Sequence, residues 1–340
     1  AINSGDGGAN NSFWGASEKL LYGYSGAIFY GQKLTSSSSN FTGMSSSDDL
    51  KYVGDDGQQT LNLNVNRSSY TGDFDITLGD GNDSISAIRT LSSDSIDMGA
   101  GDDQISIYVN SGEAVNVHNL AKLDGGTGND TLNFGVSGYG EAGATLTLTH
   151  RGATNFENLE GTAESETING DSNANILAGG DGADTINGFG GNDTLYGRGS
   201  GSSDDSSNNT LNGGTGNDIL ITGNGADTLD GGTGADTITT GTGNDTIVIR
   251  IGDGGSTLAD ADTITDFTDG TDVLGLDDGL QYTDLNIAQG TGSNANNTII
   301  SSGSEYLAIL TGINASNVNY MDFTSTATSA QSFTGTTGDD

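Results

Sequence analysis

The sequence contains no cysteine and no proline. Without cysteine, the fold has neither disulfide bonds nor thiolate metal sites, so other contacts must hold it together. Without proline, no X-Pro isomerisation slows folding. The sequence also lacks an apolar run near the ~18 residues of a membrane span, and we expect no membrane insertion.

Basic and apolar residues are both scarce. Nine Lys and Arg face 46 Asp and Glu, which gives a net charge of -37 and excludes nucleic acid as a partner. Apolar residues make up 32% of the chain, too few for one thick core. Such a composition is typical of disorder unless bound counter-ions neutralise the chain. The acids are mainly Asp (38, against 8 Glu) and accompany 57 Gly, a combination typical of turns and metal ligands.

A nonapeptide of the form G-G-x-G-x-D-x-U-x, where U is apolar, recurs along the chain. Four units follow one another without a gap from Gly213 to Val248, and two more begin at Gly179 and Gly188. The Asp positions of these six units are Asp184, Asp193, Asp218, Asp227, Asp236 and Asp245. Isolated copies place further aspartates at Asp83, Asp103 and Asp130.

Each position of the nonapeptide has a physical role. The glycines permit positive φ, so six residues wrap tightly with their carbonyls pointing inward. The D-x-U triplet forms a short strand whose U residue points inward. The predicted inward residues are Ile186, Leu195, Leu220, Leu229, Ile238 and Ile247. This nonapeptide is a general signature of calcium-binding β-helices.

Calcium takes six to eight oxygen ligands, more than one turn supplies. If two nonapeptides make one coil, Asp218 stacks on Asp236, and Asp227 stacks on Asp245 at the opposite edge. We therefore predict two ladders holding roughly ten Ca²⁺ ions between successive coils. The side-chain ligands would be the nine aspartates above together with Asp262 and Asp266. Carbonyl ligands would come from Gly179, Asp181, Gly213, Thr215, Gly231 and Thr233. A metal-free Gly/Asp linker is the alternative, but a linker would not keep an apolar residue two places after every Asp.

The predicted fold class is all-β: a parallel β-roll, or β-solenoid, with calcium ladders. We divide the chain into an N-terminal β or interface region (1–77), degenerate coils (78–178), the regular roll (179–248), a β cap (249–325) and a tail (326–340). Within the degenerate coils, Ile168 and Ile176-Leu177 are predicted to point inward. Ser200 to Asn209 reads as a polar insertion between coils. Loss of glycine and gain of apolar residues beyond 249 are typical of a solenoid cap.

The repeats at 179–248 resemble those of the RTX (repeats-in-toxin) family of bacterial secreted proteins. The segment Asp262-Thr263-Ile264-Thr265-Asp266-Phe267, followed by Asp272-Val273-Leu274, is similar to an element that closes many RTX β-rolls. The resemblance implies export by a type I secretion system and calcium-triggered folding outside the cell. We therefore expect a secreted, extracellular or cell-surface location.

The sequence offers no catalytic constellation, and we expect no enzyme. Neither of the two histidines, His118 and His150, lies in an H-E-x-x-H motif, and Gly23–Ala27 lacks the last glycine of G-x-S-x-G. The leading hypothesis is a structural subunit of a surface layer or filament, whose partners are other copies of itself and cell-surface polysaccharide. The aromatic N-terminal segment forms the interface or caps its own solenoid. An adhesin module for glycans or ice, and the C-terminal part of a secreted enzyme or toxin, remain the alternatives.

Overall fold

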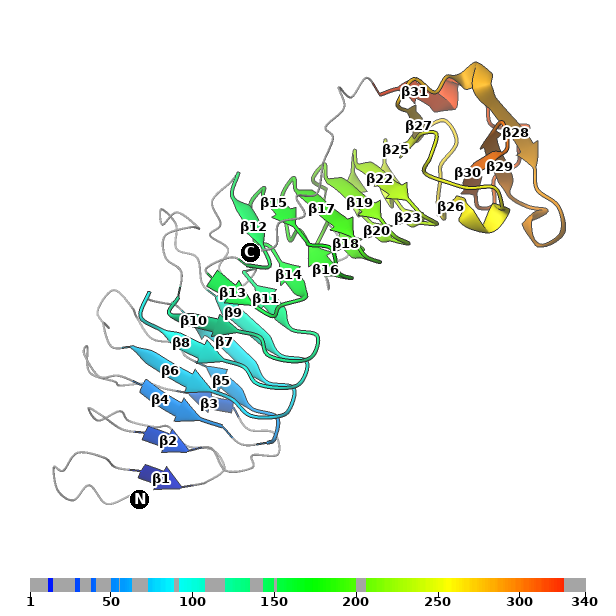
Figure 1. The fold of residues 1–340 in the computed structure, drawn as a ribbon. Coiled ribbons are helices and arrows are strands. Elements are labelled where there is room, and N and C mark those ends of the chain that lie inside the picture. The colour runs from blue at the N-terminus through cyan, green and yellow to red at the C-terminus, as the bar shows by residue number, and fades with distance from the viewer. Residues whose placement is uncertain are drawn as a thin grey trace. The chain divides into compact units, whose positions relative to one another are not determined.

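The computed structural model describes residues 12–14, 28–30, 38–40, 50–54, 56–62, 73–88, 92–107, 120–134, 143–149, 152–199 and 206–326. In these ranges the chain is all-β: besides strands it forms only single 3₁₀ turns (η2, Leu258–Asp260; η3, Tyr282–Asp284; η4, Gly292–Asn294; η5, Tyr320–Asp322). Among the same residues, no helix has the length and apolar character needed to cross a membrane. The predicted fold class is confirmed (Figure 1).

The chain forms two compact units. Unit 1 comprises residues 1–141 and 147–160, and unit 2 comprises residues 142–146 and 161–340. The boundary at 160 and 161 falls inside the segment 78–178, which the sequence treats as one stretch of degenerate coils. The coils before and after this boundary therefore belong to different units.

Unit 1 consists of parallel strands in two sheets. The first sheet has the order β1 (Ser12–Trp14), β2 (Ile28–Tyr30), β4 (Leu50–Val53), β6 (Phe74–Thr77), β8 (Ser95–Asp97), β10 (Lys122–Asp124) and β13 (Ala153–Thr154). The second has the order β3 (Ser38–Asn40), β5 (Thr60–Asn62), β7 (Ser84–Ile88), β9 (Gln104–Ile107), β11 (Thr131–Asn133) and β14 (Asn158–Glu160). Strands adjacent in a sheet belong to successive coils of the solenoid.

The coils of unit 1 vary in length but keep a continuous core. Ser84 pairs with Gln104 of the next coil, whereas Leu123 pairs with Ala153 after a clearly longer path. The inward side chains are nevertheless almost completely buried at Leu61, Phe74, Ile76, Ile85, Ile96, Ile105, Leu123, Leu132 and Leu159. Since each strand contributes only a few inward residues, the core is a narrow column rather than one thick layer.

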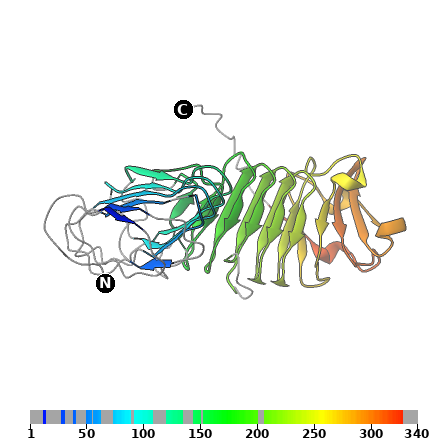
Figure 2. The same ribbon diagram turned by 90° about the horizontal axis from the view of Figure 1, so that it is seen from below.

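Unit 2 contains the regular roll, also in two sheets. One comprises β12 (Thr145–Thr147), β15 (Thr167–Asn169), β17 (Thr185–Gly190), β19 (Thr210–Thr215), β22 (Thr228–Thr233), β25 (Thr246–Ile249), β27 (Val273–Leu276) and β31 (Phe323–Ser325). The other comprises β16 (Ile176–Ala178), β18 (Thr194–Tyr196), β20 (Ile219–Ile221), β23 (Thr237–Thr239), β26 (Asp262–Ile264), β30 (Glu305–Leu310), β29 (Thr298–Ser302) and β28 (Leu285–Gln289). The short strands β21 (Asn224–Gly225) and β24 (Thr242–Gly243) pair in a turn. Figure 2 shows the successive strands of this unit lying side by side.

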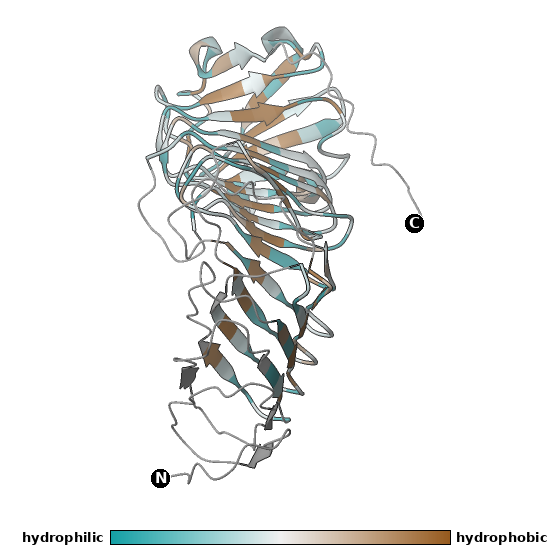
Figure 3. Ribbon diagram, turned by 90° about the vertical axis from the view of Figure 1, so that its left-hand side faces the viewer, coloured by the Kyte–Doolittle hydropathy of each residue, from teal (hydrophilic) through white to brown (hydrophobic). Residues whose placement is uncertain are grey.

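The register of unit 2 fits two nonapeptides per coil. Thr210 pairs with Thr228, and Thr228 pairs with Thr246, so equivalent positions recur after two repeat lengths. All six predicted inward residues are fully buried, and Ile168 and Leu177 join them. The prediction for Ile176 is wrong: it is 47% exposed, because adjacent strand residues point to opposite faces. Figure 3 shows this alternation as brown segments between paler ones along the strands.

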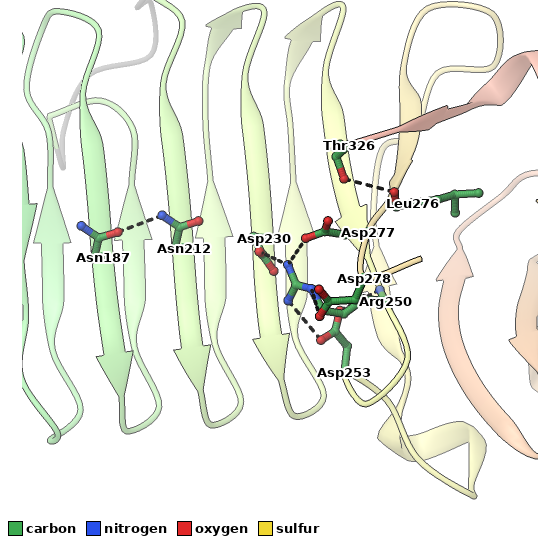
Figure 4. A network of polar contacts seen from close by, with 9 residues as sticks. All are labelled: Asn187, Asn212, Asp230, Arg250, Asp253, Leu276, Asp277, Asp278 and Thr326. Atoms are coloured by element: carbon green, nitrogen blue, oxygen red, sulfur yellow. Dashed lines mark hydrogen bonds and ion pairs between the residues drawn. The ribbon is translucent and has the colours of Figure 1, made fainter. Parts of the chain in front are cut away.

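The roll of unit 2 ends in a cap. β26 pairs in parallel with β30, and β30, β29 and β28 then form an antiparallel meander. Arg250 contacts carboxylates from the last coil and from the cap: its guanidinium hydrogen-bonds to Asp230, and Nη1 lies 3.2 Å from Asp253 (Figure 4). Its Nη2 also lies 3.6 Å from Asp277. With Asp278 3.9 Å from Nε, one fixed cation joins four carboxylates where the regular coils stop.

Several sequence predictions fall outside the described residues. These are the side chains of the aromatic N-terminal segment, both histidines, and the tail after Thr326. The proposed interface role of the N-terminal segment therefore stays a prediction.

Candidate metal site

The turns of successive coils stack directly on one another. Gly232 and Gly234 have φ of 88° and 134°, a region that L side chains rarely adopt. A Cβ on Gly234 would lie 1.8 Å from the carbonyl oxygen of Gly216, the equivalent residue one coil earlier. Glycine is therefore required for two reasons at this position: the backbone conformation and the close approach of the neighbouring turn.

The aspartates of one edge of unit 2 form a continuous ladder. The backbone N–H of each donates to Oδ1 of the next: Asp193 to Asp218 (2.7 Å), Asp218 to Asp236 (2.7 Å) and Asp236 to Asp262 (3.0 Å). The second edge repeats the contact between Asp227 and Asp245 (2.9 Å). The predicted stacking of Asp218 on Asp236 and of Asp227 on Asp245 is confirmed.

Unit 1 builds the same ladder at one edge from widely spaced copies. The N–H of Asp83 donates to Oδ1 of Asp103 (2.7 Å), and the N–H of Asp103 donates to Oδ1 of Asp130 (2.8 Å). Their turns are joined by bridges that link Asp80 to Ala100 and Ala100 to Thr127. The isolated repeats of the sequence are therefore neighbours in the fold.

The second carboxylate oxygen of the ladder residues is buried without a hydrogen bond. This holds for Oδ2 of Asp103, Asp130, Asp193, Asp218, Asp236, Asp245 and Asp262. None of these residues is more than 1% exposed. Burying a carboxylate oxygen without a partner is costly unless a cation or a proton compensates it. A row of such oxygens therefore fits a row of cations.

Carbonyl oxygens converge on the same places. The point where a Cβ of Gly213 would lie is 2.4 Å from Asp218 Oδ2 and 2.5 Å from the carbonyl oxygen of Gly231 in the next coil. At Gly188 the corresponding distances are 2.4 Å to Asp193 Oδ2 and 2.6 Å to the carbonyl oxygen of Gly213. Gly188 and Gly213 thus each leave an oxygen-lined gap between coils. Hard oxygen donors of this kind suit Ca²⁺.

The predicted carbonyl ligands differ in their surroundings. The carbonyls of Gly179, Gly213 and Gly231 face the first glycine of the preceding coil at Gly161, Gly188 and Gly213. The carbonyl of Thr233 instead accepts a hydrogen bond from the N–H of Gly216 (2.9 Å). Asp181 donates its N–H to the carbonyl of Thr162 (3.0 Å), and Thr215 pairs with Thr233 between strands. The three glycine carbonyls therefore lie close to buried carboxylates, and metal binding by the carbonyls of Asp181, Thr215 and Thr233 stays a prediction.

Asp266 differs from the other predicted side-chain ligands. Its Oδ1 accepts from the N–H of Thr240 (3.0 Å), and its Oδ2 accepts from the N–H of Gly241 (2.8 Å). Both oxygens are used to close a turn of the preceding coil. Metal binding by Asp266 stays a prediction, and its structural role is to fasten β26 to the last regular turn.

The environment raises the pKa of the ladder aspartates. Burial is the main cause, and it brings the pKa of Asp103 and Asp193 to about 7. Burial also raises the pKa of Asp236 to about 6, against the opposing effect of the hydrogen bond from the N–H of Asp218. Neighbouring ladder carboxylates add to the rise at all three residues. Without a cation, these groups would take up protons near neutral pH.

In the described residues, no three His, Cys, Asp or Glu side chains cluster closely enough to hold a metal by themselves. A cation would therefore need carbonyl oxygens as well as carboxylates. Two stacked turns provide both kinds of donor, for example Asp218 with the carbonyl of Gly231. When bound there, Ca²⁺ would supply the positive charge that the buried carboxylates lack.

The sequence prediction missed several members of the ladders. Glu157, Glu166, Asn175 and Asn209 occupy the Asp position, each two residues before a buried Leu or Ile. Asn209 is not part of a polar insertion as predicted: its Oδ1 accepts from the N–H of Asp184 (2.9 Å), and its N–H donates to Asp227 (2.7 Å). Asp272 extends the second edge into the cap by accepting from the N–H of Asp245 (3.2 Å). A search for any Asp, Asn or Glu two places before an apolar residue would have found all five.

Stacked glycine turns with buried aspartate ladders define the class of calcium-binding parallel β-rolls. The model of the RTX calcium-binding nonapeptide repeat matches four stretches, at residues 122–136, 160–200, 203–238 and 230–248. In these four stretches the chain therefore carries RTX calcium-binding repeats. The search of curated proteins finds no match to the chain.

Proposed function

We propose that this chain is an extracellular structural protein, a subunit of a bacterial surface layer or filament that folds and assembles when it binds calcium. The observation that carries the proposal is the row of buried carboxylate oxygens facing carbonyl oxygens of the next coil, as at Asp218 and Gly231. These groups cannot all stay charged in a folded chain without cations. Folding is therefore linked to the calcium concentration.

The size of this linkage matches a folding switch. Extracellular calcium modules bind with Kd of about 10⁻⁴–10⁻³ M. At ~10 mM calcium, a site of ~1 mM contributes about 1.4 kcal/mol. About ten independent sites would contribute ~14 kcal/mol, which is comparable with the stability of a domain. At micromolar calcium the contribution vanishes, so the chain stays unfolded for type I export and folds outside the cell.

The composition of the described residues supports a structural rather than a catalytic role in this proposal. The described residues are almost entirely coils and cap, and they include none of the catalytic motifs sought in the sequence. The strands β28 and β31 end their sheets and present open edges to other molecules. The partners in this proposal are other copies of the chain, with cell-surface polysaccharide as the anchor.

Electron micrographs of the purified protein test the proposal. We expect regular filaments or sheets in ~10 mM calcium and dispersed, poorly folded chains after chelation. A monodisperse monomer across the concentrations of a surface layer, with calcium present, would contradict the structural role while leaving calcium binding intact.

A second candidate is a binding module for glycans or ice. The outer face of one sheet of the roll carries a row of threonines in register, at Thr167, Thr185, Thr210, Thr228 and Thr246. Beside it runs a row of asparagines, in which Nδ2 of Asn212 donates to Oδ1 of Asn187 (2.8 Å; Figure 4). A flat, regular polar face of this kind orders water or sugar hydroxyls. Glycan-array binding or ice shaping by the calcium-loaded monomer would favour this candidate.

A further inference from the structure

The cap ends in an edge strand with little protection against pairing. Among the described strands, β28 is the last in the order of its sheet, and it pairs with β29 alone (Figure 1). Its five residues, Leu285 to Gln289, carry no charge. Natural edges are usually shielded by Lys or Pro, yet the chain has no proline, and none of its four lysines lies after Lys122. Such an edge is suited to receive another strand.

The outward backbone groups of β28 follow from its pairing with β29. The N–H of Gly290 donates to the carbonyl of Asn297 (2.9 Å), so this pair is hydrogen-bonded. Bonded and non-bonded pairs alternate in antiparallel strands. Asn286 and Ala288 therefore point their backbone groups toward β29, whereas Leu285, Ile287 and Gln289 point theirs outward. Only the N–H of Leu285 is used locally, by the carbonyl of Tyr282.

We propose that β28 pairs antiparallel with β28 of a second copy of this chain, about a two-fold axis at Ile287. In this register, Ile287 lies opposite Ile287 of the partner and exchanges two hydrogen bonds with it. The carbonyl of Leu285 accepts from the N–H of the partner's Gln289, and the two-fold axis repeats this bond between the partner's Leu285 and Gln289. The N–H of Leu285, which would otherwise donate to the carbonyl of the partner's Gln289, is already bonded to Tyr282 within the cap, so that Gln289 carbonyl is left to water.

The side chains around this axis are compatible with pairing. Leu285 and Ile287 lie on one face and are half-buried, while Asn286 lies on the other face and is exposed. The nearest acid, Asp284, would lie opposite Gly290 of the partner. The register therefore places no like charges against each other, which matters in a chain with a net charge of -37.

The inference rests on the proposed assembly of copies of this chain and adds one specific contact to it. A five-residue strand pair is smaller than a standard interface of ~1,600 Å². Free in solution we expect it to be weak, and in an assembly it is strengthened by simultaneous contacts elsewhere. Because a two-fold contact closes on itself, growth of a filament or layer needs a second, different contact.

Cysteine crosslinking of the full chain tests the register, since the natural sequence contains no cysteine. In the variant Ile287→Cys, the two thiols would meet across the axis, where Cα atoms of a hydrogen-bonded pair lie about 5.5 Å apart. In the control variant Asn286→Cys, the two Cα atoms would lie roughly 8 Å apart on the other face, beyond disulfide reach. With diamide as oxidant in ~10 mM calcium, we expect Ile287→Cys to form dimers at least ~10-fold faster than the control. Equal rates would overturn the inference.

A second variant tests the contact while the far-UV spectrum checks that the protein is still folded. Ile287→Lys places two like charges opposite each other and should lower the dimer fraction at least ~10-fold in sedimentation experiments, with an unchanged far-UV spectrum. An unchanged dimer fraction would refute the contact. Micrographs distinguish the β28 pairing from the proposed structural role. If Ile287→Cys forms assemblies but no crosslinks, only the β28 register is contradicted. If Ile287→Cys forms crosslinked dimers that do not assemble further, only the structural role is contradicted.

Discussion

Both units stack coils around an apolar column beside buried aspartates, but the coils of unit 2 are more regular than those of unit 1. Unit 2 has a regular register and carries ladders at both edges, with Asp218 stacked on Asp236 and Asp227 on Asp245. Unit 1 has coils of unequal length, and its described ladder, from Asp83 through Asp103 to Asp130, lies at one edge. At the other edge a single buried aspartate, Asp94, accepts from the N–H of Phe74 (2.8 Å). Both units nevertheless bury the same kind of apolar column.

The comparison distinguishes the roles of two features of the nonapeptide, its residue pattern and its spacing. The D-x-U triplet and the stacked glycine turn recur in both units, so they form the unit of folding. The spacing of the repeat sets only how tightly the chain returns to the next strand. Five predictions test this division of roles.

Calcium removal should have the largest effect, and it should be greater in unit 2. Loss of each site removes about 1.4 kcal/mol at ~10 mM calcium, and unit 2 has sites at both edges. Hydrogen exchange after chelation should rise most in β20 and β23 and least in β6 and β8, which lie away from the ladder of unit 1. Equal exchange in these two pairs of strands would contradict the comparison.

Substitution of a stacked glycine should cost more than substitution of an unstacked one. In Gly234→Ala the new Cβ would collide with the Gly216 carbonyl, and we expect a loss of at least ~3 kcal/mol. Gly252 also has positive φ (102°), but no atom lies within 4 Å of its Cβ position, so Gly252→Ala should cost only about 1 kcal/mol. Denaturant melts in calcium measure both values. Similar losses would mean that backbone conformation, and not stacking, sets the requirement for glycine.

Asp218→Asn should have opposite effects with and without calcium. The amide oxygen can still accept the N–H of Asp193, as Asn209 does for Asp184. In calcium, loss of the charged ligand should destabilise the roll by about 2 kcal/mol. At lowered calcium the variant should retain more far-UV β signal than the wild type, because a buried carboxylate is removed. A variant that is less stable under both conditions would argue against a cation site there.

Asn209→Asp should complete the second ladder of unit 2. The neighbours Asp184 and Asp227 already contact this position, so the change adds one carboxylate to a formed turn. Titration calorimetry should detect one more bound Ca²⁺ ion, and stability in ~10 mM calcium should rise by about 1 kcal/mol. An unchanged stoichiometry would show that Asn209 already supports a site.

The pH dependence of the calcium-free protein should be the smallest effect. Burial raises the pKa of Asp103 and Asp193 to about 7 in the folded chain, above the value of 3.8 for a free Asp. Their contribution to stability is therefore fully present below about pH 4 and lost as the pH rises through about 7. In chelator, the residual far-UV β signal should be larger at pH 5 than at pH 8. With saturating calcium the trend should reverse, because protons compete for the ligands.

The regular roll could be predicted from the sequence because each turn there repeats the whole pattern. The register, the inward residues and the stacking of Asp227 on Asp245 followed from spacing alone. The link between Asp103 and Asp130 could not be predicted, because it depends on a long return path that no period marks. Ile176 and Asn209 were misassigned for local reasons: two adjacent apolar residues hid the alternation, and an amide replaced the expected carboxylate.

The connection between β18 and β19 shows how the roll tolerates change. Thr185 pairs with Thr210, and Thr194 pairs with Ile219. In the following coils the corresponding pairs are Thr210 with Thr228 and Ile219 with Thr237, and the chain between them is shorter. The extra residues are thus accommodated without disturbing either sheet or the Asn209 contact. Residues inserted at this position therefore lengthen the connection without becoming part of either sheet. A peptide inserted there should leave the pairing of the strands on both sides unchanged.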